Sequence, residues 1–283
     1  MGRGSVQGRS RRGFLGLLGA GLAVHLAGCA AATASPDAGS QTRASGPAPP
    51  RERLADGPDT AVPPSRASSS GPPVVLRHGP AGNTKLALTI DDGYAAGVVA
   101  GYVAFAARTG LHLTFCPNAS YAHAWNPHAP LLRPLIEAGQ VQIMNHTVNH
   151  PDLTRLPADR VRAELEDNEA WVQRIFATST RPYYRPPYGA HNVGVDHIAA
   201  DAGFDRVVLW NGSYGDSSVV TPQYLIDQAR RYFNPGVIML GHANHPTVLT
   251  LFDQLAELLR DRQLQPVTLD EMFSTHRPPT GTG

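Results

Sequence analysis

The chain has 283 residues, of which 42% are hydrophobic and 17% are charged, and its formal net charge is +1 at pH 7. Because residues 1–28 contain four arginines and no acidic residue, the rest of the chain is weakly acidic, which gives little electrostatic support for nucleic-acid binding. The two cysteines are Cys29 and Cys116. Since Cys29 belongs to an export-type signal, Cys116 has no partner for an internal disulfide, and its apolar neighbours predict a buried packing residue rather than a nucleophile.

Residues 1–29 resemble a bacterial export signal. Arg11 and Arg12 precede an apolar run at residues 15–27, as in signals of the twin-arginine type, and residues 26–29 read Leu-Ala-Gly-Cys, which is similar to a lipobox. Cleavage there would leave Cys29 as a lipidated first residue, so we expect an exported protein anchored on the outer face of the cytoplasmic membrane. A plain signal peptide that yields a secreted protein is the alternative.

Residues 30–80 consist mainly of Ala, Ser, Pro and Gly and contain too few large apolar side chains to bury a core. We therefore expect a disordered tether, with a reach on the order of 40 Å, between the membrane and residues 81–283. Those last roughly 200 residues suffice for one domain with a sizeable core.

Apolar strands alternate with amphipathic helices along residues 81–283, which predicts a parallel sheet with short connections. About seven such strands can curve into a distorted (β/α) barrel of the α/β class, whose active site would lie at the carboxyl ends of the strands. In chain order, the expected strands are residues 85–90, 112–116, 141–145, 183–185, 206–209, 237–240 and 266–268, and the expected helices are residues 95–109, 130–138, 157–177, 192–202, 221–232 and 247–262.

Two segments at strand ends carry metal-binding residue types. Residues 88–93 read Leu-Thr-Ile-Asp-Asp-Gly, and residues 145–150 read Asn-His-Thr-Val-Asn-His. One carboxylate and two histidines supply three protein ligands and leave a coordination position open for water, as in catalytic zinc-type sites. The second carboxylate of the pair would remain beside the metal, which is typical of a hydrolase.

These segments resemble the ordered sequence motifs of the polysaccharide deacetylases, carbohydrate esterase family 4. Residues 89–93 are similar to the first motif and residues 146–150 to the second, while residues 185–189 read Arg-Pro-Pro-Tyr-Gly and residues 238–242 read Ile-Met-Leu-Gly-His, as in the third and last motifs. The resemblance extends over residues 85–268. It implies a hydrolase that removes acetyl groups from N-acetylated sugars of a cell-wall or extracellular polysaccharide.

The resemblance also implies a role for each residue of the first two motifs. Asp92, His146 and His150 would bind one divalent metal ion, usually zinc and sometimes cobalt. Asp91 would act as the general base.

The third and last motifs imply the remaining catalytic roles. Arg185 would orient Asp91 and keep it ionised, and the backbone N–H of Tyr188 would stabilise the oxyanion. His242 would protonate the departing amine, and Leu240 would line the pocket for the acetyl methyl group.

The fourth motif departs from the family pattern, in which an Asp precedes a second Asp that is followed by Trp. Ser213 stands at the position of the first Asp, which normally tunes the catalytic histidine, and Ser217 at the position of the Trp, which offers a sugar-stacking face. We expect Asp216 and Trp210 to contact the substrate. Whether Asp216 or another residue supports the catalytic histidine is open.

Two other functions remain as alternatives. One is an O-acetyl esterase acting on a glycan, and the other is a catalytically weakened carbohydrate-binding lipoprotein, against which the presence of Asp91 and His242 argues. The expected partners are an acetylated polysaccharide or oligosaccharide and, through the lipid anchor, the membrane. Among the other histidines, His245 is expected near the rim of the site.

Overall fold

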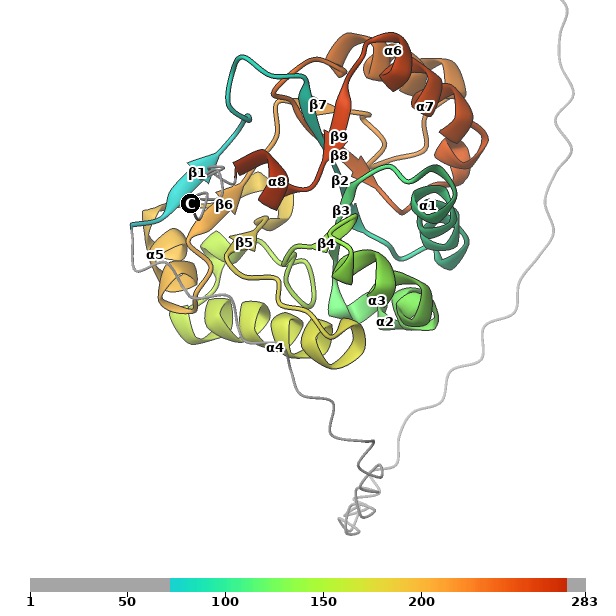
Figure 1. Ribbon diagram of the computed structural model, residues 1–283. Coiled ribbons are helices and arrows are strands. Elements are labelled where there is room, and N and C mark those ends of the chain that lie inside the picture. The colour runs from blue at the N-terminus through green and yellow to red at the C-terminus, as the bar shows by residue number, and fades with distance from the viewer. Residues whose placement is uncertain (1–71, 274–283) are drawn as a thin grey trace, which may run out of the picture. The chain divides into compact units, whose positions relative to one another are not determined.

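The computed structural model of the protein describes residues 72–273 (Figure 1). The expected export signal, the lipidation site Cys29 and residues 30–71 of the expected tether lie outside the described residues. The end of the expected tether needs a correction, because Val74–Leu76 forms strand β1 and pairs in parallel with strand β6, Arg206–Val208. Backbone pairing holds β1 in the domain, although two of its three side chains are exposed.

The strands form two parallel sheets that together make a distorted barrel. One contains β1, β6 and β5 (Tyr183–Tyr184), and the other contains, in order, β4 (Val141–Ile143), β3 (Leu113–Pro117), β2 (Lys85–Asp92), β8 (Ile238–His242) and β7 (Gly212–Ser213), with β9 (Gln265–Val267) paired to the start of β2. Every strand pairing in the described part of the chain is parallel.

The two sheets are connected on both sides. A parallel bridge between Asn145 and Tyr184 joins the end of β4 to β5. On the other side, the chain runs from β6 through residues 209–211 into β7, which pairs with β8. All seven expected strands are present, so the prediction of an α/β distorted barrel is confirmed, with β1 and β7 as additional short strands.

Helices surround the strands on the outside of the barrel (Figure 1). They are α1 (Ala96–Thr109), α2 (Ala122–Trp125), α3 (Ala129–Glu137), α4 (Ala158–Phe176), α5 (Val193–Asp201), α6 (Pro222–Tyr232), α7 (Phe252–Asp261) and α8 (Leu269–Phe273). The helix expected over residues 247–262 is divided into a 3-10 turn, Pro246–Thr250, and α7. Within residues 72–273, no helix is both long enough and apolar enough to cross a membrane.

Strand β2 occupies the centre of the larger sheet. Its residues 86–91 are all buried, because neighbouring strands cover both of its edges and the sheet's faces are packed, which explains the nearly continuous apolar run in its sequence. Cys116 of β3 is also fully buried, and burial raises the pKa of its thiol, in agreement with the expected packing role. Because all the strands run in one direction, the carboxyl ends of β2, β4, β5 and β8 meet at one end of the barrel.

Candidate active site

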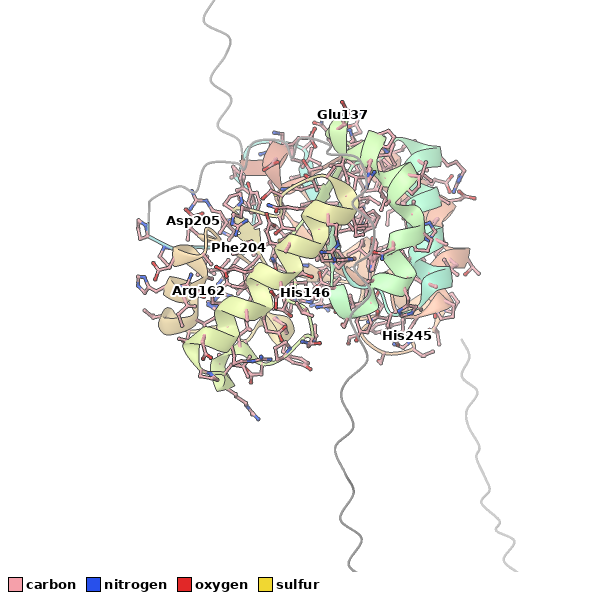
Figure 2. The ribbon with its side chains drawn as sticks, turned by 90° about the horizontal axis from the view of Figure 1, so that it is seen from below. Glu137, His146, Arg162, Phe204, Asp205 and His245 are labelled. Atoms are coloured by element: carbon pink, nitrogen blue, oxygen red, sulfur yellow. The ribbon has the colours of Figure 1, made fainter. Side chains whose placement is uncertain are left out.

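The residues expected to form the site line one cavity of about 480 Å³ at the carboxyl ends of the strands. Its walls contain Asp91, Asp92, His146, His150, Pro186, Tyr188, Trp210, Ser213, Ser217, Leu240 and His242. Figure 2 shows His146 in the same half of the view as His245, on the opposite side from Glu137 at the end of α3. The structure therefore brings together residues that are up to 151 positions apart in the sequence.

Three of these side chains direct metal-ligand atoms at one another. Asp92 Oδ1 lies 3.3 Å from His146 Nε2 and 3.5 Å from His150 Nε2. Nδ1 of His146 lies 2.8 Å from the carbonyl oxygen of Arg185, so this nitrogen carries the donated proton and Nε2 keeps its lone pair. Asp92, His146 and His150 thus form a group able to hold a metal ion.

The surroundings of Asp92 fit a divalent cation. Its Oδ2 accepts a 2.7 Å hydrogen bond from Asn244, whereas its buried Oδ1 has no hydrogen-bond partner in the described part of the chain. A buried carboxylate oxygen without a partner is unfavourable unless a cation compensates it. Burial alone would raise the pKa of Asp92, but the closeness and charge of His146 and His150 hold this pKa well below its usual range. The residues present therefore fit the metal that the motifs imply.

The backbone around the ligands is held in conformations that most residues avoid. The φ angle is 65° at Asp92 and 56° at His150, both in the left-handed region, where a non-glycine residue needs support from its surroundings. Glu164 of α4 supplies part of this support, because its carboxylate accepts hydrogen bonds of 3.0 and 2.8 Å from the N–H groups of Val148 and Asn149. A helix on the outside of the barrel thus holds the loop that carries both histidines.

Asp91 forms a buried ion pair with Arg185. Asp91 Oδ1 accepts a 2.6 Å hydrogen bond from Arg185 Nη1, and both side chains are almost completely buried. The other guanidinium nitrogens donate to the carbonyl oxygens of Val208 and Leu209 at 3.2 and 3.4 Å, which fixes the plane of the group. Asp91 Oδ2 lies 3.5 Å from His146 Nε2, so the second oxygen faces the metal-ligand group. Arg185 therefore lies where its expected orienting role requires.

His242 lies opposite Asp91 in the pairing of β2 with β8. Its Nδ1 is 2.9 Å from Asp216 Oδ1, and its backbone N–H donates to Asp216 Oδ2 at 3.1 Å. Burial alone would lower the pKa of His242, but the hydrogen bond to Asp216 and the charges of Asp91, Asp216 and Asp92 raise it. The protonated form, which an acid catalyst needs, is thereby favoured.

This geometry corrects one expectation about the fourth motif and answers one question that the sequence leaves open. Asp216 is buried behind His242 and is not part of the cavity wall, so it does not contact the substrate as we expected. Asp216 is also the carboxylate that supports the histidine, whereas position 213 carries a serine. The reason is the register of β7, which pairs Ser213 with Leu240, so that the following turn at Gly215, with φ of 69°, brings residue 216 to His242.

Tyr188, Leu240 and Trp210 line the cavity, where a substrate would meet them. Tyr188 has a φ of 61°, and its side chain is 71% exposed with the ring 4.6 Å from that of His150 in an edge-to-face arrangement. Leu240 is buried and lines the cavity, which is consistent with its expected contact with the methyl group of an acetyl substituent.

Besides Glu164, three supporting residues are missed by the sequence analysis. Asn244 holds Asp92 as described, Asn118 donates from its side chain to the carbonyl oxygen of His146, and Trp125 Nε1 donates to the carbonyl oxygen of Asp92 at 2.9 Å. Asn118 directly follows β3 and Asn244 lies two residues after β8, so their position near strand ends is a usable signal. Trp125 belongs to the short helix α2, and nothing in its local sequence indicates this contact.

A metal-ligand group beside a carboxylate that can accept a proton and a histidine that can donate one defines the machinery of a hydrolase. Residues 78–207 match the family model described as polysaccharide deacetylase. This match confirms the resemblance that the four ordered motifs indicated.

Comparison with known proteins gives relatives of low sequence identity. The peptidoglycan-N-acetylmuramic acid deacetylase PdaA of Bacillus subtilis is 28% identical over 57% of this chain and 62% of its own length. The peptidoglycan-N-acetylglucosamine deacetylase PgdA of Listeria monocytogenes is 27% identical over 68% of this chain and 39% of its own length. The chain therefore spans less than two thirds of either relative.

Solved structures show the same fold. A family 4 carbohydrate esterase pseudoenzyme from Bacillus anthracis superposes with a TM-score of 0.63 at 18% identity, over 71% of this chain and 69% of its own. A family 4 carbohydrate esterase from Streptomyces lividans, solved with acetate, superposes with a TM-score of 0.57 at 23% identity, over 65% of this chain and 92% of its own.

Proposed function

We propose that this protein is a metal-dependent deacetylase that removes acetyl groups from N-acetylated sugars of a cell-wall or extracellular polysaccharide. The observation that carries the proposal is the convergence of Asp92, His146 and His150 beside Asp91, with His242 opposite, in one cavity. The sugar class is supported by the two relatives named for deacetylation of peptidoglycan amino sugars.

Asp92, His146 and His150 would hold the divalent ion, which polarises the acetyl carbonyl and lowers the pKa of water when bound. Asp91 takes the proton of the attacking water as general base. Its pairing with Arg185 suits this role, because one carboxylate oxygen is fixed by the guanidinium and the other faces the metal-ligand group.

His242 donates a proton to the departing nitrogen. An amine needs this proton to leave, and the hydrogen bond between His242 Nδ1 and Asp216 holds the histidine in place to supply it. The backbone N–H of Tyr188, in its left-handed turn at the cavity wall, would donate to the oxyanion that forms on the acetyl carbonyl.

The test is acetate release from matched N-acetylated and O-acetylated oligosaccharides by the purified protein, with and without added zinc. We expect zinc-dependent release from N-acetylated substrates, and its loss in Asp91→Asn. Asp227→Asn is the matched control, because Asp227 lies on α6 with an exposed side chain. Release from the O-acetylated set alone would establish the esterase alternative, and no release from either set would identify a protein without turnover, like the Bacillus anthracis pseudoenzyme.

We further propose that the protein is exported and lipid-anchored. Support for this comes from Arg11, Arg12 and the Leu-Ala-Gly-Cys sequence that ends at Cys29. An anchor at Cys29, joined to the domain by residues 30–71, would place the catalytic domain within reach of a wall polymer.

A further inference from the structure

A cluster of aromatic rings, formed by Tyr94, Tyr121 and His245, stands beside the cavity and is not used by the chemistry above. Tyr94 is 43% exposed, and its ring centroid lies 5.9 Å from those of both Tyr121 and His245, with interplanar angles of 67° and 85°. Edge-to-face contacts of this kind are favourable and hold a ring in one orientation. Tyr94 follows β2, Tyr121 ends a 3-10 turn after β3, and His245 follows β8, so three separate loops fix one exposed ring.

The backbone of Tyr94 is tied to the metal-ligand group. Asn244 Oδ1 accepts hydrogen bonds from the N–H groups of Gly93 and Tyr94 at 3.1 and 3.4 Å, while the other end of the same amide donates to Asp92 Oδ2. The distance between the Tyr94 ring and the reacting centre is therefore set by a short hydrogen-bonded segment and not by a flexible loop.

The cluster is continuous with the cavity. Ser217 lines the cavity, and its carbonyl oxygen lies 3.4 Å from His245 Nε2. Ser217 also stands at the position where the family pattern has a Trp, so this part of the wall carries no indole face. An exposed phenol ring just outside offers a flat apolar surface with a hydroxyl, which suits the faces of a pyranose.

We propose that Tyr94, supported by Tyr121 and His245, binds the sugar that is linked to the acetylated one, so that the protein selects oligomers over single sugars. The proposal rests on the proposed function for the nature of the ligand and adds a second subsite to it. Tyr94 is a specificity residue in this account, because its ring stacks on a sugar that does not react.

The test combines a binding readout with a chemical one. The binding partner is the β-1,4-linked tetramer of N-acetylglucosamine, titrated calorimetrically into protein that carries Asp91→Asn, so that the tetramer is not deacetylated during the measurement. Adding Tyr94→Ala to this protein should weaken tetramer binding about 3–10-fold. Tyr94→Phe should keep most of the affinity, and His245→Ala should show a smaller loss, because the ring remains but one support is removed. Leu131→Ala is the matched control, since Leu131 is a 46% exposed apolar residue on α3.

Hydrolysis of 4-nitrophenyl acetate supplies the chemical readout, because this small ester reaches only the cavity. With Asp91 intact, its rate should be the same for the wild type and Tyr94→Ala, which also verifies that the variant folds. Unchanged tetramer affinity in Tyr94→Ala, or no tetramer binding by the parent protein, would overturn the subsite. Tyr94-dependent tetramer binding without any acetate release would instead count against the proposed function alone.

Discussion

Asn244 offers a sharp test of how the site holds its metal. Its 2.7 Å hydrogen bond to Asp92 Oδ2 leaves Oδ1 of the same carboxylate directed at His146 and His150. A hydrogen bond to a charged group contributes about 1.5–3 kcal/mol. At about 1.4 kcal/mol per factor of ten, Asn244→Ala should weaken divalent-metal binding on the order of 10–100-fold, in the range typical of residues that orient metal ligands.

Competition for zinc between the protein and a chromophoric chelator measures this affinity directly. Asn234→Ala is a suitable control, because the exposed Asn234 amide donates to the carbonyl oxygen of Arg231, far from the metal ligands in the sequence. Saturating zinc should restore most of the turnover of Asn244→Ala, since Asp91 and His242 keep their own partners. Unchanged zinc affinity in a variant with a normal melting temperature would refute the idea that Asn244 fixes the ligand.

Four further outcomes are expected, three from the geometry of the site and one from the sequence around Cys29. Asp91→Asn should retain zinc but lower turnover on the order of 10²–10⁴-fold, whereas His146→Ala should lose both zinc binding and turnover. Loss of zinc in Asp91→Asn would mean that the roles of Asp91 and Asp92 are reversed. Chelation should abolish acetate release and added zinc or cobalt should restore it, and full activity in metal-free protein would exclude the metal. Asp216→Asn should move the alkaline limb of the pH profile of kcat to lower pH. The reason is that the pKa of His242 falls once this carboxylate charge is lost, and His242 must be protonated to act as the acid. An unchanged profile would show that Asp216 does not tune the pKa of His242. Cys29→Ser should release the protein from membranes, and wild-type protein found entirely in the medium would contradict the anchor.

The sequence alone predicts most of the barrel because its signals are local. Residues 85–90 form an apolar run ended by two carboxylates, and such a run is recognisable as a buried parallel strand without any knowledge of its neighbours. Strands β1 and β7 are not predicted from the sequence, because β1 has three residues and β7 has two, which is too short for a recognisable periodicity. Both depend on pairing with another strand, β1 with β6 and β7 with β8.

The same distinction applies to the site. Asp91, Asp92, His146 and His242 are indicated by the sequence because each lies at or shortly after the carboxyl end of a strand, and parallel strand ends converge. The sequence names Asp216 as a candidate partner of His242 but leaves the choice open, because the contact depends on the register of β7 and on the turn after it. The helix expected over residues 247–262 is interrupted where Leu249 packs against Gly101 of α1, so closely that a Cβ at position 101 would lie 2.2 Å from the Leu249 side chain, and this long-range contact is not visible in the local sequence.

Trp125 makes the hydrophobic core and the site share one wall. It is fully buried against Phe115, and its indole N–H holds the carbonyl oxygen of Asp92. Gly93, with φ of 93°, passes so close that a Cβ would lie 2.3 Å from the indole nitrogen. One added methyl group at position 93 would displace the indole and, with it, the backbone that aims the ligand carboxylate. Substitutions that repack the core around Trp125 to raise thermal stability will therefore also change the affinity for the metal, even when no metal-ligand residue is altered.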